Sequence, residues 1–236
     1  MGDGTRTRDA GRGVSSPLDP QRAPRPASRV PRPVNGAILA GGAASRFGGR
    51  PKGLELVGGE RVVDRLAGVM QEALGQPPVL IANDPDAASW GTGLRIEGDV
   101  LPGYGALGGI HAAVARAPAP VVAVAWDMPF INLRLVTLLA DALVSGIDAV
   151  LPASGGRRGM EPLCAAYGPA CEPAIRRALE RGDRRAISFH DDVNVALLPL
   201  EQVASAGTPE LLFFNINTAE DLAQAERQWQ RASSAS

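Results

Sequence analysis

Short apolar runs alternate with segments of helical periodicity from residue 34 onward. Residues 34–40, 78–83 and 121–126 are nearly continuous apolar stretches, which is typical of strands buried on both faces of a sheet. Between the first two runs, apolar residues recur at spacings of three and four over 62–74, which predicts an amphipathic helix. This alternation of strands and helices predicts one α/β domain with a mostly parallel sheet.

The same pattern continues to the end of the chain, although it becomes less regular. It predicts a short strand at 94–96, a helix of small residues ending near Ala117, a helix over 133–143 and a strand over 148–151. Further on it predicts a strand at 163–167, a helix at about 170–181, a second helical stretch after Asp183, strands near 193–198 and 211–214, and a final helix. A capping box of Thr218 and Asp221 opens that helix, which runs to about Gln230.

The first 33 residues differ in composition from the rest. They contain seven arginines, three aspartates and six prolines, and therefore carry a net charge of +4 with almost no apolar periodicity. Such a segment cannot build a core, so we expect residues 1–33 to be a disordered tail and residues 34–236 to form the folded domain. Because the whole chain carries −1, the folded part carries −5.

Composition excludes several classes of protein. No apolar run approaches the length of about 18 residues that a membrane span needs. Two cysteines, Cys164 and Cys171, are too few for a disulfide framework and are interpreted as reduced structural thiols of a cytoplasmic protein. The net charge of −1 argues against nucleic acid as the main partner.

A glycine-rich loop directly follows the first predicted strand. It reads Leu39-Ala40-Gly41-Gly42-Ala43-Ala44-Ser45-Arg46-Phe47-Gly48-Gly49-Arg50-Pro51-Lys52. Glycines let a backbone approach a ligand closely, so that successive N–H groups point at an anion such as a polyphosphate, and Arg46 and Lys52 add positive charge. The spacing matches neither GxGxxG nor the P-loop, which disfavours a Rossmann cofactor loop and a P-loop. Lys52 is also the single lysine among 24 basic residues, which indicates a role for a compact ammonium.

Asp127 ends the most continuous apolar strand of the chain. Ligands of open α/β sheets bind outside the carboxyl ends of the strands, where a carboxylate can hold a Mg²⁺ that bridges nucleotide phosphates. The alternative is that Asp127 caps the helix that begins near Asn132. The basic loop upstream favours the metal role.

Three motifs together resemble those of the molybdenum cofactor guanylyltransferases, a family of nucleotidyltransferases with a Rossmann-like sheet. They are Leu39-Ala40-Gly41-Gly42 with Arg46, Gly48 and Lys52; Asp127-Met128-Pro129-Phe130; and Asn215-Ile216-Asn217-Thr218. Between them stands Pro102-Gly103-Tyr104-Gly105-Ala106-Leu107-Gly108-Gly109. The resemblance covers about residues 34–230 and implies a single three-layer Rossmann-like domain. This chain has Trp126 before Asp127, where the family usually has a small residue or cysteine.

The resemblance also implies roles for individual residues. Leu39, Ala40, Gly41 and Gly42 would contact base and phosphates, Arg46 and Lys52 the phosphates, Asn83 and Asp99 the nucleoside, Asp127 the Mg²⁺, and Asn215 and Asn217 the acceptor. Asn83 and Asp99 are alternatively plain turn residues. Asn215 and Asn217 are alternatively part of a capping turn.

The activity implied by the resemblance is Mg²⁺-dependent transfer of GMP from GTP to Mo-molybdopterin, with release of pyrophosphate. Molybdoenzymes or their chaperones would then receive the product. Three alternatives stay open: the same transfer from CTP, nucleotidyl transfer to another small phosphate, and a non-catalytic protein that binds nucleotide or pterin and delivers the cofactor.

Overall fold

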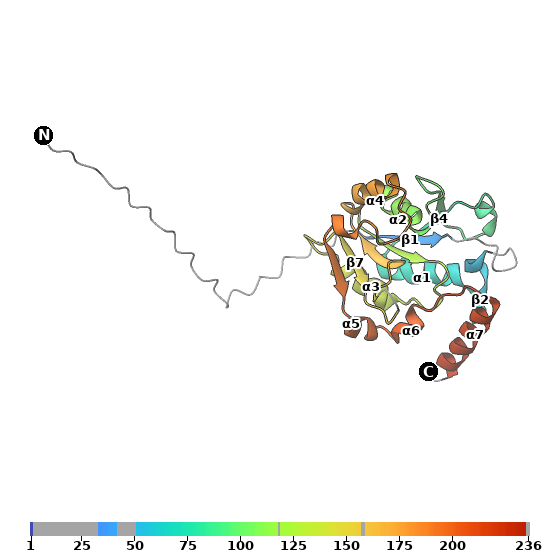
Figure 1. Ribbon diagram of the computed structural model, residues 1–236. Helices are drawn as coiled ribbons and strands as arrows, with labels where there is room; N and C mark the ends of the chain where they lie inside the picture. Colours follow the sequence, from blue (N-terminus) through green and yellow to red (C-terminus); the bar gives the residue numbers. More distant parts are fainter. Residues whose placement is uncertain (2–32, 42–50, 118, 157–158, 235–236) are drawn as a thin grey trace. The chain divides into compact units, whose positions relative to one another are not determined.

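The apolar runs of the sequence form a seven-stranded sheet in this computed structural model (Figure 1). The structure describes residues 33–41, 51–117, 119–156 and 159–234, together with Met1. The strands of the sheet are β1 (Asn35–Ala40), β4 (Val79–Ala82), β5 (Arg95–Glu97), β6 (Val121–Ala125), β7 (Ala149–Pro152), β8 (Cys164–Tyr167) and β9 (Val195–Leu198). Their spatial order is β5-β4-β1-β6-β8-β7-β9.

The predicted mostly parallel sheet is confirmed. β1 pairs in parallel with β4 on one side and with β6 on the other, and β4 pairs in parallel with β5. Only β8 runs against its neighbours β6 and β7 among the strands of this sheet, within the part of the chain that the structure describes. In chain order, β4 and β5 extend the sheet on one side of β1, and β6 then continues it on the other side. The topological switch point of the sheet therefore lies between β1 and β6.

Helices cover both faces of the sheet, so the predicted three-layer architecture is also confirmed (Figure 1). α1 (Val62–Leu74) and α3 (Leu133–Ala142) pack together on one face. α2 (Gly105–Arg116) and α4 (Cys171–Glu180) pack together on the other. A Cβ at Gly109 of α2 would lie 3.8 Å from Cδ2 of Leu39 on β1, so this helix lies close to the sheet.

The alternation of side chains along β6 explains why its sequence is apolar throughout. Val122 and Val124 point into the core beneath α1 and α3, whereas Val121 and Ala123 point into the core beneath α2 and α4. All four side chains are buried. A strand between two helical layers has no solvated face, so polar residues have no place on it.

A two-stranded hairpin follows the first loop and was not predicted. It consists of β2 (Leu56–Val57) and β3 (Glu60–Arg61), joined by Gly58 and Gly59, whose φ angles are 62° and 79°. Left-handed conformations at both turn positions favour glycine, and a Gly-Gly pair between two strands is a recognised hairpin signal. The strands are only two residues long, too short to show a pattern in the sequence.

Two predictions for the C-terminal region are wrong. Residues 211–214 do not form a strand, because α6 (Pro209–Leu212) begins with a proline at its first position, where the missing N–H is no loss. The stretch after Asp183 contains only the short 3₁₀ helix His190–Asp192 rather than a longer helix. α5 (Leu200–Ala204) was not predicted, and the final helix is confirmed as α7 (Ala219–Ser234).

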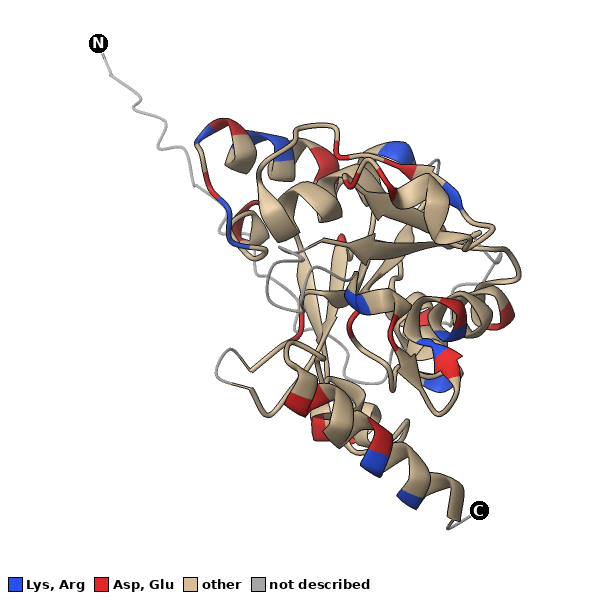
Figure 2. Ribbon diagram, turned by 90° about the vertical axis from the view of Figure 1, so that its right-hand side faces the viewer, with Lys and Arg blue, Asp and Glu red and all other residues tan. Residues whose placement is uncertain are grey.

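Acidic and basic residues are interleaved over the helices on the ribbon (Figure 2). In α7, Glu220 and Asp221 lie in the first turn and Arg231 lies in the last, which matches the helix dipole. None of the helices in the described ranges has the length and apolar character required to cross a bilayer. Residues 1–33 were expected to be disordered; apart from Met1 and Pro33, they lie outside the residues that the structure describes.

Both cysteines are buried and unbonded to each other. Burial raises the pKa of the Cys171 thiol to about 12, and its Sγ donates a hydrogen bond to the carbonyl oxygen of Asp148 at 3.1 Å. The interpretation of Cys171 as a structural thiol therefore agrees with its surroundings.

The core between α1 and α3 gives a direct test of the packing. Leu139 is fully buried on α3, so Leu139→Ala should lower the free energy of unfolding by about 2–5 kcal/mol. Leu133 lies on the same helix with 37% exposure, and Leu133→Ala should cost less than about 1 kcal/mol. Urea unfolding curves of the two variants measure the difference, and equal losses would contradict the buried position of Leu139.

Candidate active site

The expected site residues follow the carboxyl ends of adjacent parallel strands. Lys52 opens a 3₁₀ helix (Lys52–Leu54) after the loop that leaves β1, and Asp127 lies two residues beyond β6. β1 and β6 are neighbours, and the N–H of Trp126 donates to the carbonyl of Leu39 at 3.2 Å. This is the point at which the sheet changes its direction of growth, where open α/β sheets bind ligands.

The ammonium of Lys52 joins three segments that are distant in sequence. Its Nζ lies 3.6 Å from Oδ2 of Asp127 and donates a 2.7 Å hydrogen bond to Oδ1 of Asn217. The Lys52 side chain is 12% exposed and that of Asp127 is 16% exposed. A cation and an anion this far from water stabilise each other more than a surface pair does.

Asp127 does not cap the following helix. That function belongs to Asn132, whose side chain accepts a hydrogen bond from the N–H of Leu135 at 3.0 Å, so the capping alternative for Asp127 is wrong. The carbonyl of Asp127 accepts a 2.9 Å hydrogen bond from the N–H of Ile216, which fixes the C-terminal segment beside it. Burial raises the pKa of the Asp127 carboxyl, and the charge of Lys52 offsets part of that increase.

The segment before α7 contains both a capping box and a site contact. Asp221 Oδ2 accepts hydrogen bonds from the N–H groups of Asn217 and Thr218, and Thr218 Oγ1 accepts one from the N–H of Asp221. The predicted box is therefore confirmed, and it leaves the Asn217 side chain available for Lys52. The Asn215 side chain instead bonds to its own segment, since its Nδ2 donates to the carbonyl of Phe213 at 2.9 Å.

Asn83 and Asp99 lie together at the ends of β4 and β5. Oδ1 of Asn83 accepts a 2.7 Å hydrogen bond from the N–H of Asp99. A Cβ at Gly108, in the first turns of α2, would lie 2.9 Å from Oδ2 of Asp99, so glycine leaves room for this carboxylate. Burial raises the pKa of Asp99, while Asn83 and His111 lower it in part.

The first loop is described only at its two ends. Leu39 is 6% exposed and packs in the core between the sheet and α2. Ala40 ends β1 and Gly41 is exposed just after it. Gly42 and Arg46 lie outside the described residues.

Trp126 packs against Gly53, the residue directly after Lys52, which the sequence did not predict. Its ring lies 5.1 Å from that of Trp90, at the end of the 3₁₀ helix Ala87–Trp90. A Cβ on Gly53 would lie 2.3 Å from Cε3 of Trp126, so only glycine fits directly after the lysine. The bulky residue before Asp127 is thus accommodated by a missing side chain next to Lys52.

The ammonium of Lys52 is suited to bind a phosphate group. The ammonium of Lys52 has three donors, and a phosphate oxygen is a strong acceptor for them. In the described ranges there is no group of three or more histidine, cysteine, aspartate or glutamate side chains placed to hold a metal ion. A metal here would therefore depend on one protein carboxylate together with ligand oxygens.

The contact between Gly53 and Trp126 predicts a specific sensitivity to substitution. Gly53→Ala should lower the free energy of unfolding by about 1–3 kcal/mol because the new methyl group collides with the indole ring. Adding Trp126→Cys should make the double variant less unstable than the sum of the two single changes. Urea unfolding measures both effects.

Gly68 provides the matched control for this glycine. It lies on α1 with open space where the methyl group of an alanine would stand, so Gly68→Ala should raise stability by about 0.5–1 kcal/mol. If Gly53→Ala did not lower stability relative to Gly68→Ala, Trp126 would not pack against Gly53 as described.

The buried carboxylate of Asp127 predicts a pH dependence of stability. Because its pKa is raised in the folded protein, the folded state binds a proton more readily than the unfolded state, and stability from this group rises as the pH falls through the raised pKa. The melting temperature of Asp127→Asn relative to the wild type, measured in EDTA, should therefore fall between pH 7 and pH 4, because only the wild type gains stability by protonating this carboxyl; loss of the partner of Lys52 adds a cost at both pH values. A difference in melting temperature that stays constant between pH 7 and pH 4 would contradict a raised pKa of Asp127.

Comparisons with known proteins agree with this arrangement. The family model of the MobA-like NTP transferase domain matches residues 36–193. A probable molybdenum cofactor guanylyltransferase of Pelotomaculum thermopropionicum is 36% identical over 193 residues, 81% of this chain and 91% of the relative. The molybdenum cofactor guanylyltransferase of Desulfosudis oleivorans is 31% identical over 195 residues, 82% of this chain and 94% of the relative.

A solved structure extends the similarity to three dimensions. Molybdopterin-guanine dinucleotide biosynthesis protein A of Archaeoglobus fulgidus superimposes with a TM-score of 0.70 at 27% identity, covering 84% of this chain and all of that one. These alignments cover 91–100% of the three relatives. This chain therefore belongs to the MobA-like nucleotidyltransferases, in the family of the molybdenum cofactor guanylyltransferases.

Proposed function

We propose that this enzyme transfers GMP from GTP to Mo-molybdopterin, forming molybdopterin guanine dinucleotide and releasing pyrophosphate. The observation that carries the proposal is the meeting of Lys52, Asp127 and Asn217 at the switch point of the sheet. The relatives that are named guanylyltransferases support GTP as the donor and molybdopterin as the acceptor. We place the reaction in the cytoplasm, where the thiols of Cys164 and Cys171 stay reduced.

The reaction needs no nucleophile from the protein. A phosphate oxygen of the acceptor attacks the α-phosphorus of GTP, a P–O bond forms, and the bond to the leaving pyrophosphate breaks. Negative charge then has to be stabilised on the α-phosphate and on the leaving group. Lys52 supplies a positive charge there: Asn217 accepts from one of its three donors and Asp127 lies 3.6 Å away, which leaves a donor for a phosphate oxygen.

Asp127 would hold the Mg²⁺ of the reaction. Mg²⁺ is commonly bound by one or two carboxylates, substrate phosphates and water, which fits the single buried carboxylate beside Lys52. When bound, the ion neutralises phosphate charge and orients the triphosphate. The raised pKa of Asp127 reflects a carboxylate that is poorly solvated in the free protein, so a cation has a favourable position beside it.

The nucleoside would lie further along the same edge of the sheet. Asn83 and Asp99 follow β4 and β5, the two strands that extend the sheet on one side of β1, and are joined by a hydrogen bond. The backbone from Leu39 to Gly42 with Arg46 would contact the base and phosphates. Asn215 and Asn217 would bind the acceptor on the other side of Lys52.

Turnover of variants tests these roles. Lys52→Ala and Asp127→Ala should each lower the rate of pyrophosphate release by about 10²-fold or more, as loss of one preorganised charge does in other enzymes. Glu201→Gln, an exposed carboxylate change on α5, should leave the rate unchanged. A wild-type rate in Asp127→Ala would remove the metal role from this residue.

The choice of nucleotide and acceptor is tested with the same assay. Purified protein with Mg²⁺ and Mo-molybdopterin should release pyrophosphate with GTP, and omission of the acceptor should abolish release. Release with CTP alone would keep the mechanism and change the product. Nucleotide binding without any release would instead indicate a delivery protein.

A further inference from the structure

The C-terminal helix α7 contacts the hairpin that follows Lys52. Oε1 of Glu226 accepts a 3.0 Å hydrogen bond from the N–H of Gly58, in the turn between β2 and β3. Glu226 is separated from Gly58 by more than 160 residues of sequence, so the contact is a tertiary one. It closes the hairpin against α7 rather than leaving it as a free surface loop.

A buried arginine completes the attachment. The guanidinium of Arg65 on α1 lies 3.7 Å from the centre of the Trp229 ring on α7. The same side chain donates through Nε to Glu60 at 3.1 Å and through a terminal nitrogen to the carbonyl of Val57. Arg65 is only 9% exposed, so the interaction between the cation and the ring is shielded from water.

Gly58 allows α7 to come this close. Its φ angle is +62°, and an added Cβ would lie 2.1 Å from Nε1 of Trp229. The helix, the arginine and the turn are therefore fitted to one another, and no larger residue is accommodated at position 58.

The hairpin is connected to Lys52 by a few residues of well-bonded backbone. The N–H of Glu55 donates to the carbonyl of Lys52 at 3.1 Å, and the N–H of Val62 donates to the carbonyl of Glu55 at the same distance. Val57 is fully buried. A displacement of the hairpin is therefore passed to the lysine backbone rather than absorbed by a slack loop.

The opposite end of α7 reaches the lysine side chain. Asn217 lies just ahead of the helix, accepts the hydrogen bond from Lys52 Nζ, and is fixed by Asp221 in the first turn. The segment at the start of α7 thus holds the Lys52 ammonium, and residues further along α7 hold the hairpin β2–β3.

We propose that α7 is a strap that positions Lys52, with Trp229 and Glu226 as positioning residues for the donor nucleotide. This inference rests on the proposed function, in which Lys52 binds the phosphates. Lysine has a long flexible side chain, and an error of about 1 Å in the placement of a substrate-binding group can reduce a rate by about 10²-fold. Residues that touch no substrate therefore control how well this lysine meets it.

Nucleotide affinity of the full chain tests the strap. The Kd for GTP in the presence of Mg²⁺ should rise by about ten-fold in Trp229→Ala, whereas Trp229→Phe, which keeps an aromatic face for Arg65, should stay within about three-fold of the wild type. Glu226→Ala should weaken binding and Glu226→Gln, which keeps an acceptor for Gly58, should restore most of it.

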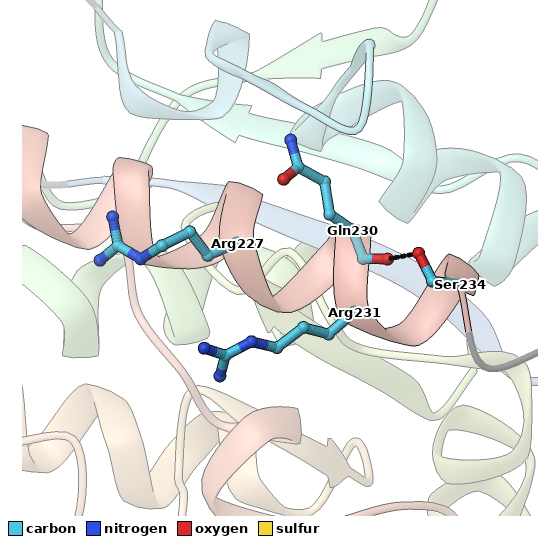
Figure 3. A pocket seen from close by; sticks show the side chains of 4 residues that line it. All are labelled: Arg227, Gln230, Arg231 and Ser234. Atoms are coloured by element: carbon cyan, nitrogen blue, oxygen red, sulfur yellow. Dashed lines mark hydrogen bonds between the residues drawn. The ribbon is translucent and has the colours of Figure 1, made fainter.

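Exposed residues of α7 supply the controls. Arg227, Gln230, Arg231 and Ser234 line a shallow hollow on the exposed face of the helix (Figure 3). Arg231→Ala changes an exposed side chain of the same helix, on the side away from Trp229, and should leave the Kd unchanged. Circular dichroism shows whether each variant keeps its helices.

A double-mutant cycle separates positioning from general damage to the fold. If Trp229 acts through Lys52, Trp229→Ala should weaken GTP binding in the wild type and have almost no further effect in a Lys52→Ala background. The inference is overturned if Trp229→Ala weakens binding equally in both backgrounds, or not at all, or no more than Arg231→Ala does.

The same cycle distinguishes failure of the inference from failure of the proposed function. When Lys52→Ala weakens GTP binding but the α7 variants are independent of it, the phosphate role stands and the strap falls. When Lys52→Ala leaves GTP binding unchanged, the phosphate role itself is wrong, and the strap falls with it.

Discussion

The ammonium of Lys52, held between the carboxylate of Asp127 and the amide of Asn217, is the interaction on which the site depends. A lysine that is 12% exposed needs compensation for the water it has lost, and these two groups provide it. Each partner comes from a different part of the chain. The contact therefore fixes the relative positions of the first loop, the end of β6 and the segment before α7.

The sheet explains why these segments meet. Parallel pairing of β1 with β6 brings the loops after both strands to one edge, and pairing with β4 and β5 continues that edge to Asn83 and Asp99. The hydrogen bond from Ile216 to the Asp127 carbonyl then anchors the returning chain. Positive charge, carboxylate and polar groups are thus arranged along the ends of four neighbouring strands, on a scaffold of fully buried residues.

Sequence patterns predicted the parts of this arrangement that are local or repetitive. The apolar run of β6 is visible because both of its faces are buried, and the glycine-rich loop and Asp127 follow from the strands they end. The hairpin β2–β3 was missed because its strands have two residues each. Residues 211–214 were assigned to a strand because four apolar or aromatic residues in a row do not distinguish a short helix from a strand.

The long-range contacts had no signal in a single sequence. Nothing in the composition of α7 indicates that Trp229 meets Arg65 or that Glu226 meets Gly58, because these pairs are set by how the helix returns to the domain. The same applies to Gly53 beneath Trp126. In retrospect, a glycine directly after a unique lysine and a tryptophan directly before the aspartate were the only local hints of that close packing.

The most direct test of the account is a crystal structure of the protein with GTP and Mn²⁺, in which anomalous scattering locates the metal. The account predicts a Mn²⁺ peak at about 2.1 Å from an Asp127 carboxylate oxygen, the distance typical of hard octahedral cations. It also predicts Lys52 Nζ within hydrogen-bonding distance of a phosphate oxygen. Mn²⁺ bound away from Asp127, or a triphosphate that leaves Lys52 paired only with the protein, would contradict it.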